Sequence, residues 1–91
     1  MLLGMFKVSG HSMLPEFKPG STLIISSIPY SVSSPKIGDV VLFKRRDKMM
    51  IKRVKKVLNK KFFVEGDNKK DSLEIGWITK SDITGKVIGK I

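Results

Sequence analysis

The sequence contains no cysteine and only one histidine, one tryptophan and one tyrosine. Without cysteine the chain has no disulfide, no thiolate zinc site and no cysteine nucleophile. One histidine without cysteine is a poor set of metal ligands, so we expect no metal and no other cofactor. That histidine, His11, directly precedes Ser12, and adjacent residues rarely place a nucleophile and its base in bonding geometry, which argues against a Ser-His-Asp triad.

Acidic residues and long apolar runs are also scarce. The chain has 8 Asp and Glu residues against 18 Lys and Arg, and its net charge is +10. The apolar residues within Met1–Phe6 are far fewer than the roughly 20 of a membrane-spanning helix, and too few for a cleavable signal peptide. We therefore expect a protein of the cytoplasm or of the membrane periphery, without a transmembrane segment. Peripheral contact with an anionic membrane, through Met1–Phe6 and the cationic surface, stays open.

The length and the pattern of apolar segments indicate the fold. The 91 residues suffice for one domain and are too few for two, so residues 1–91 are expected to form a single domain. Short β-branched and apolar segments, separated by Gly, Pro, Asn and Asp, predict a mainly β fold with little helix, either a small antiparallel β-barrel or a folded-over sheet. The expected strands span residues 5–8, 22–28, 39–44, 50–58, 62–65, 76–78 and 83–88, with turns at 45–48 and 59–61 and loops at 10–19, 30–38 and 66–71.

The first candidate for chemistry is the segment Gly10–Pro15. Gly10 allows a close backbone bend and Pro15 fixes the exit of the loop. Ser12 can therefore present its hydroxyl next to backbone N–H groups that bind an oxyanion. The alternative is a turn serine that only hydrogen-bonds its own backbone.

The second candidate is Lys52, which lies within an expected strand. Side chains alternate between the two faces of a strand, so Lys52 shares its face with Met50 and Val54. A lysine among apolar groups has a lowered pKa and can act as a base near neutral pH. The alternative is a lysine that extends from the rim of the sheet into water.

The third candidate is the polar loop Gly66-Asp67-Asn68, which is followed by Ser72. Gly-Asp-Asn is a turn signal in its own right. Polar side chains in this loop can also orient the base through hydrogen bonds.

Together these segments resemble the motifs of type I signal peptidases, in the same order and with similar spacing. Each motif is weak alone, and their shared order over residues 8–87 makes the resemblance specific. The matching stretches are Ser12-Met13-Leu14-Pro15, Gly38-Asp39-Val40-Val41-Leu42-Phe43, Lys52-Arg53-Val54, Gly66-Asp67-Asn68 with Ser72, and Ile83-Thr84-Gly85-Lys86-Val87.

The resemblance implies a serine endopeptidase with a Ser–Lys dyad, built on the β fold of the signal-peptidase catalytic core and occupying residues 1–91. Ser12 is the implied nucleophile and Lys52 its base, and the backbone N–H of Ser12 forms part of the oxyanion hole. Ser72 is the residue implied to orient the lysine. The implied substrate is a presequence or signal-like peptide of a precursor protein, bound as an extended strand and cut after small residues. The supporting residues are Ser72, Gly10, Met13, Asp67 and Asn68.

The chain also departs from the family pattern. Gly10 replaces the serine that bacterial members often have two residues before the nucleophile. The usual ending Ser-x-Asp-Ser-Arg becomes Ser72-Leu73-Glu74-Ile75-Gly76, in which Glu74 replaces the acid and Gly76 stands where arginine is expected. Only 11 residues precede Ser12, where family members usually have membrane helices. These features resemble compact soluble members, such as nickel-superoxide-dismutase maturation peptidases, and they weaken the expected support of Lys52.

Three alternatives stay open. Self-cleaving repressors share the Ser-Met-x-Pro motif and a Ser–Lys pair, but no helix-turn-helix precedes Ser12, and neither Ala-Gly nor Cys-Gly, the dipeptides that would favour this alternative, occurs in the chain. The charge also fits a non-enzymatic basic β-barrel that binds nucleic acid, but no aromatic platform is evident, so we expect no specific nucleic acid partner. The altered final motif fits an inactive peptidase.

Overall fold

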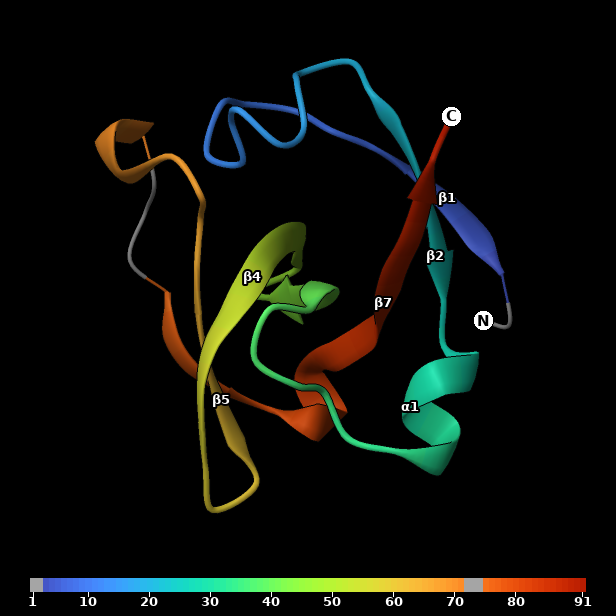
Figure 1. The fold of residues 1–91 in the computed structure, drawn as a ribbon, viewed down its shortest axis with the longest axis vertical. Coiled ribbons are helices and arrows are strands. Elements are labelled where there is room, and N and C mark those ends of the chain that lie inside the picture. The colour runs from blue at the N-terminus through green and yellow to red at the C-terminus, as the bar shows by residue number, and fades with distance from the viewer. Residues whose placement is uncertain (1–2, 72–74) are drawn as a thin grey trace.

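The structure is a computed structural model that describes residues 3–71 and 75–91. Within these residues, antiparallel strands form one 7-stranded sheet in the order β1-β2-β7-β3-β4-β5-β6 (Figure 1). The mainly β fold predicted from the sequence is therefore confirmed. The strands are β1 Gly4–Lys7, β2 Thr22–Ser26, β3 Val40–Arg45, β4 Lys48–Leu58, β5 Lys61–Glu65, β6 Gly76–Thr79 and β7 Ile83–Lys90.

The described residues contain one short α-helix, α1 (Ile28–Val32), and two 3-10 turns, η1 (Lys69–Asp71) and η2 (Lys80–Asp82). The strand expected over residues 22–28 therefore ends at Ser26, and α1 extends into the loop that was expected over residues 30–38. Pro29 lies in the first turn of α1, where its fixed φ fits a helix and its missing N–H is not needed. A helix of 5 residues is too short to show a helical period in the sequence.

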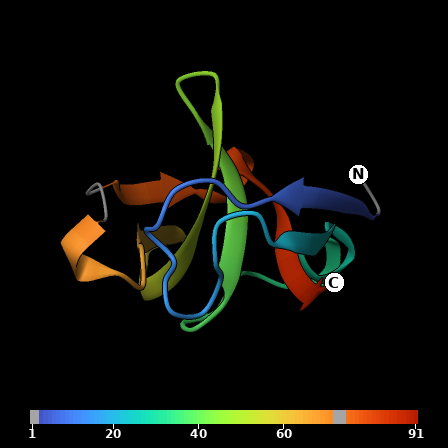
Figure 2. The ribbon, with the colours of Figure 1, turned by 90° about the horizontal axis from the view of Figure 1, so that it is seen from above.

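Two tight turns shape the middle of the chain. Arg46 and Asp47 have φ of 51° and 66°, and Asn59 and Lys60 have φ of 49° and 63°. Positive φ at both central residues is typical of the hairpin turns that match the twist of the adjoining strands. Both turns fall where the sequence predicted them. Figure 2 shows the β3–β4 hairpin projecting from the sheet, and Figure 1 shows the β4–β5 hairpin projecting at the opposite end of β4.

The sheet carries a hydrophobic core on each of its faces. The central strand β3 is buried on both sides, because Val40 and Leu42 pack into one core while Val41 and Phe43 pack into the other. Among the described residues no pairing joins β1 to β6, so pairing of these edge strands does not close the sheet into a barrel. The first core also contains Val8, Met13, Phe17, Leu23, Ile25 and Ile51, and the second contains Tyr30, Val54, Phe62, Val64 and Ile78.

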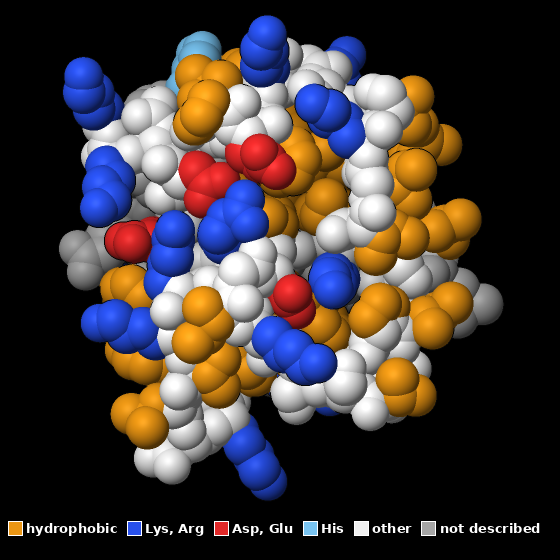
Figure 3. Space-filling model, in the orientation of Figure 1, with side chains coloured by type: hydrophobic (Ala, Val, Ile, Leu, Met, Phe, Trp, Pro, Cys, Tyr) orange, Lys and Arg blue, Asp and Glu red, His pale blue; other side chains and the backbone are white. Residues whose placement is uncertain are grey.

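The surface combines many lysines with exposed apolar side chains (Figure 3). No helix in residues 3–71 and 75–91 has the length and hydrophobicity needed to cross a membrane. Exposed apolar side chains occur in several elements of the described residues. Val57 and Leu58 lie on β4 and Trp77 on β6, and others are Leu3, Met5, Ile28, Val32, Ile37, Ile88 and Ile91.

Tyr30 connects the helix to the start of β3. Its hydroxyl donates a hydrogen bond to Asp39 Oδ2 at 2.7 Å, and the same oxygen accepts the backbone N–H of Lys36 at 3.0 Å. Lys86 Nζ on β7 lies 3.6 Å from Asp39 Oδ1. Asp39 of the Gly-Asp-Val-Val motif therefore joins α1, the loop before β3, and β7. Burial raises the pKa of Tyr30 well above its ordinary value, and the hydrogen bond and charge of Asp39 raise it further.

This raised pKa predicts a loss of stability at high pH. Below about pH 10, Tyr30 is neutral in both the folded and the unfolded chain, and its contribution is fully present. Above that pH only the unfolded chain ionises, so the free energy of unfolding falls by up to about 1.4 kcal/mol for each further pH unit. We expect Tyr30→Phe to lose less stability than wild type as the pH rises from 8 to 11, because this variant has no tyrosine to ionise. Urea unfolding over this pH range measures the difference. Because the chain has one tyrosine, its tyrosinate absorbance reports this group alone. If tyrosinate absorbance appeared in the folded protein at about pH 10, the ordinary pKa of a tyrosine, it would contradict the prediction.

Candidate active site

The structure brings the side chains of Ser12 and Lys52 together. Lys52 Nζ lies 2.6 Å from Ser12 Oγ, within hydrogen-bond distance, although the two residues are 40 positions apart in the chain. Ser12 lies in the loop between β1 and β2, and Lys52 lies on β4. This is the distance that proton transfer between a hydroxyl and an amine requires.

Among the described residues, Lys52 and Ser26 are the polar residues that are buried. The exposed fraction of Lys52 is 6%. Strand alternation places it on the same face of β4 as Met50 and Val54, as the sequence predicted, and these two residues pack with the second core. Its neighbour across the β3–β4 pairing is Val41, which is fully buried. Burial among apolar groups disfavours the charged form of an amine.

The serine loop is anchored on both sides of Ser12. Gly10 has a φ of +77°, a conformation that glycine adopts without strain and that a serine at this position would not favour. Met13 is 1% exposed and fills the first core, and its carbonyl accepts the N–H of Phe17 at 2.9 Å. Leu14 N–H donates to the carbonyl of His11 at 3.2 Å. Ser12 is therefore held between a glycine bend and a buried methionine.

Asn68 fastens the serine loop to the segment after β5. Its backbone N–H donates to the carbonyl of Ser12 at 2.8 Å, and its side-chain Nδ2 donates to the carbonyl of His11 at 2.9 Å. The sequence predicted that this polar loop would orient the base. In the structure Asn68 positions the backbone that carries the nucleophile candidate, while Ser72 of the same motif lies outside the described residues.

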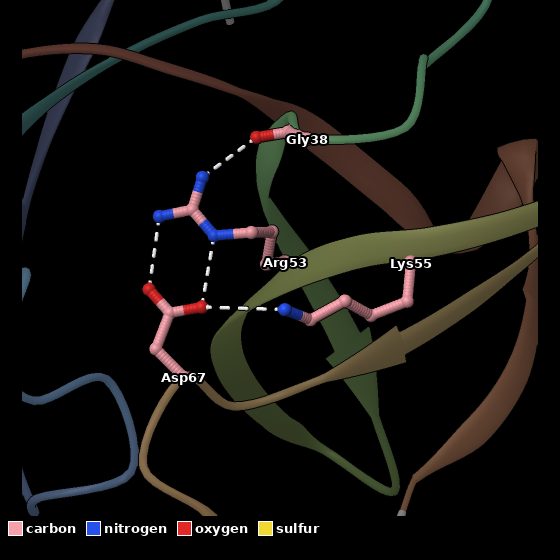
Figure 4. Close-up of polar contacts among 4 residues, drawn as sticks. All are labelled: Gly38, Arg53, Lys55 and Asp67. Carbon is pink, nitrogen blue, oxygen red and sulfur yellow. Dashed lines mark hydrogen bonds and ion pairs between the residues drawn. The ribbon is translucent and has the colours of Figure 1, made fainter.

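Asp67 accepts hydrogen bonds from Arg53, a residue for which the sequence predicted no role (Figure 4). Arg53 Nε and Nη2 donate to the two carboxylate oxygens at 2.8 and 2.9 Å, and Arg53 Nη1 donates to the carbonyl of Gly38 at 2.7 Å. Lys55 Nζ lies 3.8 Å from Asp67. The hydrogen bonds and charge of Asp67 raise the pKa of Arg53 against the opposing effect of burial.

Arg53 therefore ties together three of the segments that the sequence singled out. It lies next to Lys52 on β4, and its side chain points to the other face of the strand, toward Gly38 and Asp67. A planar guanidinium with two parallel bonds to a carboxylate fixes both partners more tightly than a lysine would. The available signal was its position, because Arg53 is the only arginine after residue 46 and directly follows the candidate base.

Of the remaining predicted site residues, Ser72 and Glu74 lie outside the described residues. Gly76 begins β6 with a φ of +85°, and no atom lies within 4 Å of the position that a Cβ would occupy. A side chain at Gly76 would therefore be strained by the backbone, although it would have space. The glycine in place of arginine is explained by this conformation.

A cavity of about 250 Å³ opens at the Ser12–Lys52 pair. Its walls come from two segments that are far apart in the sequence. No group of three acidic or histidine side chains in the described part of the chain is arranged to hold a metal ion. The lining residues are Phe6, the stretch from Val8 to Met13, and the stretch from Lys48 to Lys52.

Comparison with protein families gives one finding. The family model described as Peptidase S24-like matches residues 2–88, a range that contains the serine loop, β4 and the Asp67–Asn68 segment. Comparison with curated proteins and with solved structures gives no match. The family finding confirms the prediction of a serine–lysine peptidase domain, and it names no particular member.

Proposed function

Because the chain belongs to the Peptidase S24-like family of serine–lysine peptidases, we propose that it is a serine endopeptidase with Ser12 as nucleophile and Lys52 as general base. The observation that carries this proposal is the 2.6 Å distance between Lys52 Nζ and Ser12 Oγ. The burial of Lys52 supports it, because only a neutral amine can accept the serine proton.

The reaction follows from this geometry. Neutral Lys52 takes the hydroxyl proton as Ser12 Oγ attacks the carbonyl carbon of the scissile peptide bond. The protonated amine then gives that proton to the leaving amine, and the C–N bond breaks to leave an acyl ester on Ser12. A water molecule, deprotonated by Lys52, hydrolyses the ester and restores the hydroxyl.

Backbone donors of the serine loop complete the proposed site. The N–H of Ser12 is our candidate for stabilising the oxyanion of the tetrahedral intermediate. Such a donor must be fixed before the reaction to be effective, and this loop is fixed by the bend at Gly10, the buried Met13 and the bonds from Asn68. Gly10, Met13 and Asn68 are thus positioning residues in the proposal, and Asp67 supports them through Arg53.

The substrate is proposed to bind as an extended strand along β4. One edge of β4 pairs with β3 from Lys48 to Arg53, while β5 pairs with the opposite edge only from Arg53 onward. Among the described residues no strand pairs with the second edge of Lys48–Lys52, which lines the cavity. An extended peptide can therefore add to the sheet there and bring its carbonyl to Ser12.

We infer cleavage of another chain, in the manner of the compact signal-peptidase-like members, after small residues of a presequence. The open edge of β4 favours this over self-cleavage, because in the described part of the chain no segment is paired there. Self-cleavage remains the second candidate, since the family finding does not separate the two. A change in the mass of the pure protein on standing would identify it.

The proposal is tested with a peptide library and mass spectrometry. Wild-type protein is expected to cut library peptides after small residues, and Ser12→Ala is expected to lower the rate at least about 1,000-fold. Ser34→Ala is the matched control, because Ser34 is an exposed serine outside the cavity lining and should keep the wild-type rate. Equal cleavage by wild type and Ser12→Ala would contradict the assignment of the nucleophile. No cleavage by wild-type protein would support the inactive alternative.

A further inference from the structure

The β4–β5 hairpin and β6 carry an outward face with a distinct composition. In the strand register Lys56 lies opposite Phe63, Phe63 lies opposite Trp77, and Leu58 lies opposite Lys61. These residues alternate with the buried side chains of the same strands, so they lie on one face. We call this face, formed by Lys56, Leu58, Lys61, Phe63 and Trp77, the hairpin surface.

The aromatic part of the hairpin surface is ordered but incompletely buried. The rings of Phe63 and Trp77 meet edge to face, with centroids 5.4 Å apart at 66°. Lys56 Nζ lies 5.3 Å above the centroid of Phe63. Trp77 remains 42% exposed. A half-exposed tryptophan beside lysines is typical of a surface with one apolar and one wet side.

The tip of the hairpin exposes apolar groups on both sides of the strand. Leu58 on the hairpin surface is 60% exposed, and Val57, whose side chain points to the opposite face, is 42% exposed. Leu58, Asn59, Lys61 and Trp77 line a shallow cavity of about 310 Å³. Exposed aliphatic groups at a projecting turn gain free energy wherever an apolar phase accepts them.

The charge around the tip has one sign. The segment from Lys55 to Val64 contains lysines at 55, 56, 60 and 61 and no acidic residue. Figure 3 shows lysine and hydrophobic side chains together on the projecting hairpin at the lower left, and the acidic side chains visible in that view lie above it. Such a tip attracts a surface that is both anionic and able to accept apolar side chains.

We propose that the hairpin surface and tip bind an anionic membrane surface, with Leu58 and Trp77 at the level of the headgroups and lysines 56, 60 and 61 against lipid phosphates. Single-stranded nucleic acid fits less well. It would need several exposed aromatic rings for stacking, whereas Lys56 lies over the ring of Phe63 and Trp77 is the one half-exposed aromatic side chain on this surface.

This contact leaves the active-site cavity free. Leu58 lies six residues beyond Lys52 on β4, a separation of up to about 20 Å at the rise of an extended strand. Figure 1 shows the hairpin and the loop between β1 and β2 at opposite ends of the molecule. The membrane contact is therefore independent of the proposed peptidase activity, and Ser12→Ala is expected to bind membranes as wild type does.

Vesicle binding tests the proposal with a matched pair of variants. Wild-type protein is expected to sediment with vesicles of phosphatidylcholine and phosphatidylserine, with a blue shift in the fluorescence of Trp77, the only tryptophan. The double variant Leu58→Ser, Lys61→Glu is expected to lower the affinity at least about tenfold. The control Met5→Ser, Lys7→Glu makes the same change of charge and a similar loss of apolar surface on the exposed face of β1, and it should alter the affinity less than about twofold.

Several outcomes would overturn the proposal. Equal binding to vesicles of phosphatidylcholine alone would show that the lysines do not attract the protein to anionic lipid. Binding that is lost in the Met5, Lys7 control but kept in the hairpin variant would place the contact on β1. Displacement of vesicles by a single-stranded oligonucleotide, lost in the hairpin variant, would identify a nucleic acid surface instead. Urea unfolding of both double variants checks that they remain folded.

Discussion

Lys52→Met is expected to abolish peptide cleavage while making the protein more stable. The methionine has a similar volume and no proton acceptor, so Ser12 loses its base and the rate should fall at least about 1,000-fold. The methionine also removes a 6%-exposed amine from between Met50 and Val54. The free energy of unfolding should therefore rise by about 1–2 kcal/mol, which is the usual exchange between activity and stability at a site of this kind.

Two further variants distinguish the role of Lys52 as a general base from a purely structural role. Lys52→Arg keeps a long side chain with N–H donors near Ser12 Oγ, but a guanidinium does not accept a proton at any ordinary pH, so this variant should be inactive as well. Lys44→Met replaces an exposed lysine on β3 and should keep both the wild-type rate and, within about 0.5 kcal/mol, the stability. Cleavage rates are measured with the peptides that wild type cuts, and stability by urea unfolding. Substantial cleavage by Lys52→Met or Lys52→Arg would show that another group removes the serine proton.

Gly85→Ala is expected to destabilise the fold strongly, and more than the same change at Gly89 on the same strand. A Cβ at Gly85 would lie 2.8 Å from the carbonyl oxygen of Ser26 and 2.9 Å from Ile25 Cγ2. Both contacts are too close, and the first is with backbone that cannot rotate away. We expect the free energy of unfolding to fall by at least about 2 kcal/mol, a large part of the total for a small domain.

The strand order explains why the effect at this position is large. β7 lies between β2 and β3, so a shift at Gly85, which pairs with Leu42, disturbs both halves of the sheet. Gly89→Ala is the matched control on the same strand, because its Cβ would meet Ile24 Cδ1 at an ordinary 3.6 Å. Its stability should stay within about 0.5 kcal/mol of wild type in urea unfolding. Similar losses in the two variants would mean that the Ser26 contact is not the cause.

Local patterns account for most of what the sequence predicted correctly. Alternation along β4 placed Lys52 on the face of Met50 and Val54, because the side-chain period of a strand needs no knowledge of the rest of the fold. The turns at Arg46–Asp47 and Asn59–Lys60 were found for the same reason, since turn signals depend on neighbouring residues. The helix Ile28–Val32 was missed, because it depends on Pro29 and on the burial of Tyr30 against residues that follow it.

The order of the motifs suggested that Ser12 and Lys52 act together, but it could not show how they meet. Their approach depends on Met13 filling the first core and on Asn68 holding the carbonyl of Ser12. The bond from Arg53 to Asp67 likewise joins residues whose pairing no local pattern predicts. Each of these contacts links segments distant in the chain, and only the folded sheet brings them together.

By itself the sequence determined the β character, the turns, the apolar face of Lys52 and the family resemblance, because each is carried by spacing between near neighbours. The tertiary structure decided that β7 enters the middle of the sheet and that Arg53 joins Gly38 to Asp67. It also placed the half-exposed Trp77 of β6 beside the lysines of the β4–β5 hairpin. The physical reason is that strands far apart in the chain pair in the order that buries both faces of β3 at once. That selection depends on the whole set of core side chains rather than on any one segment.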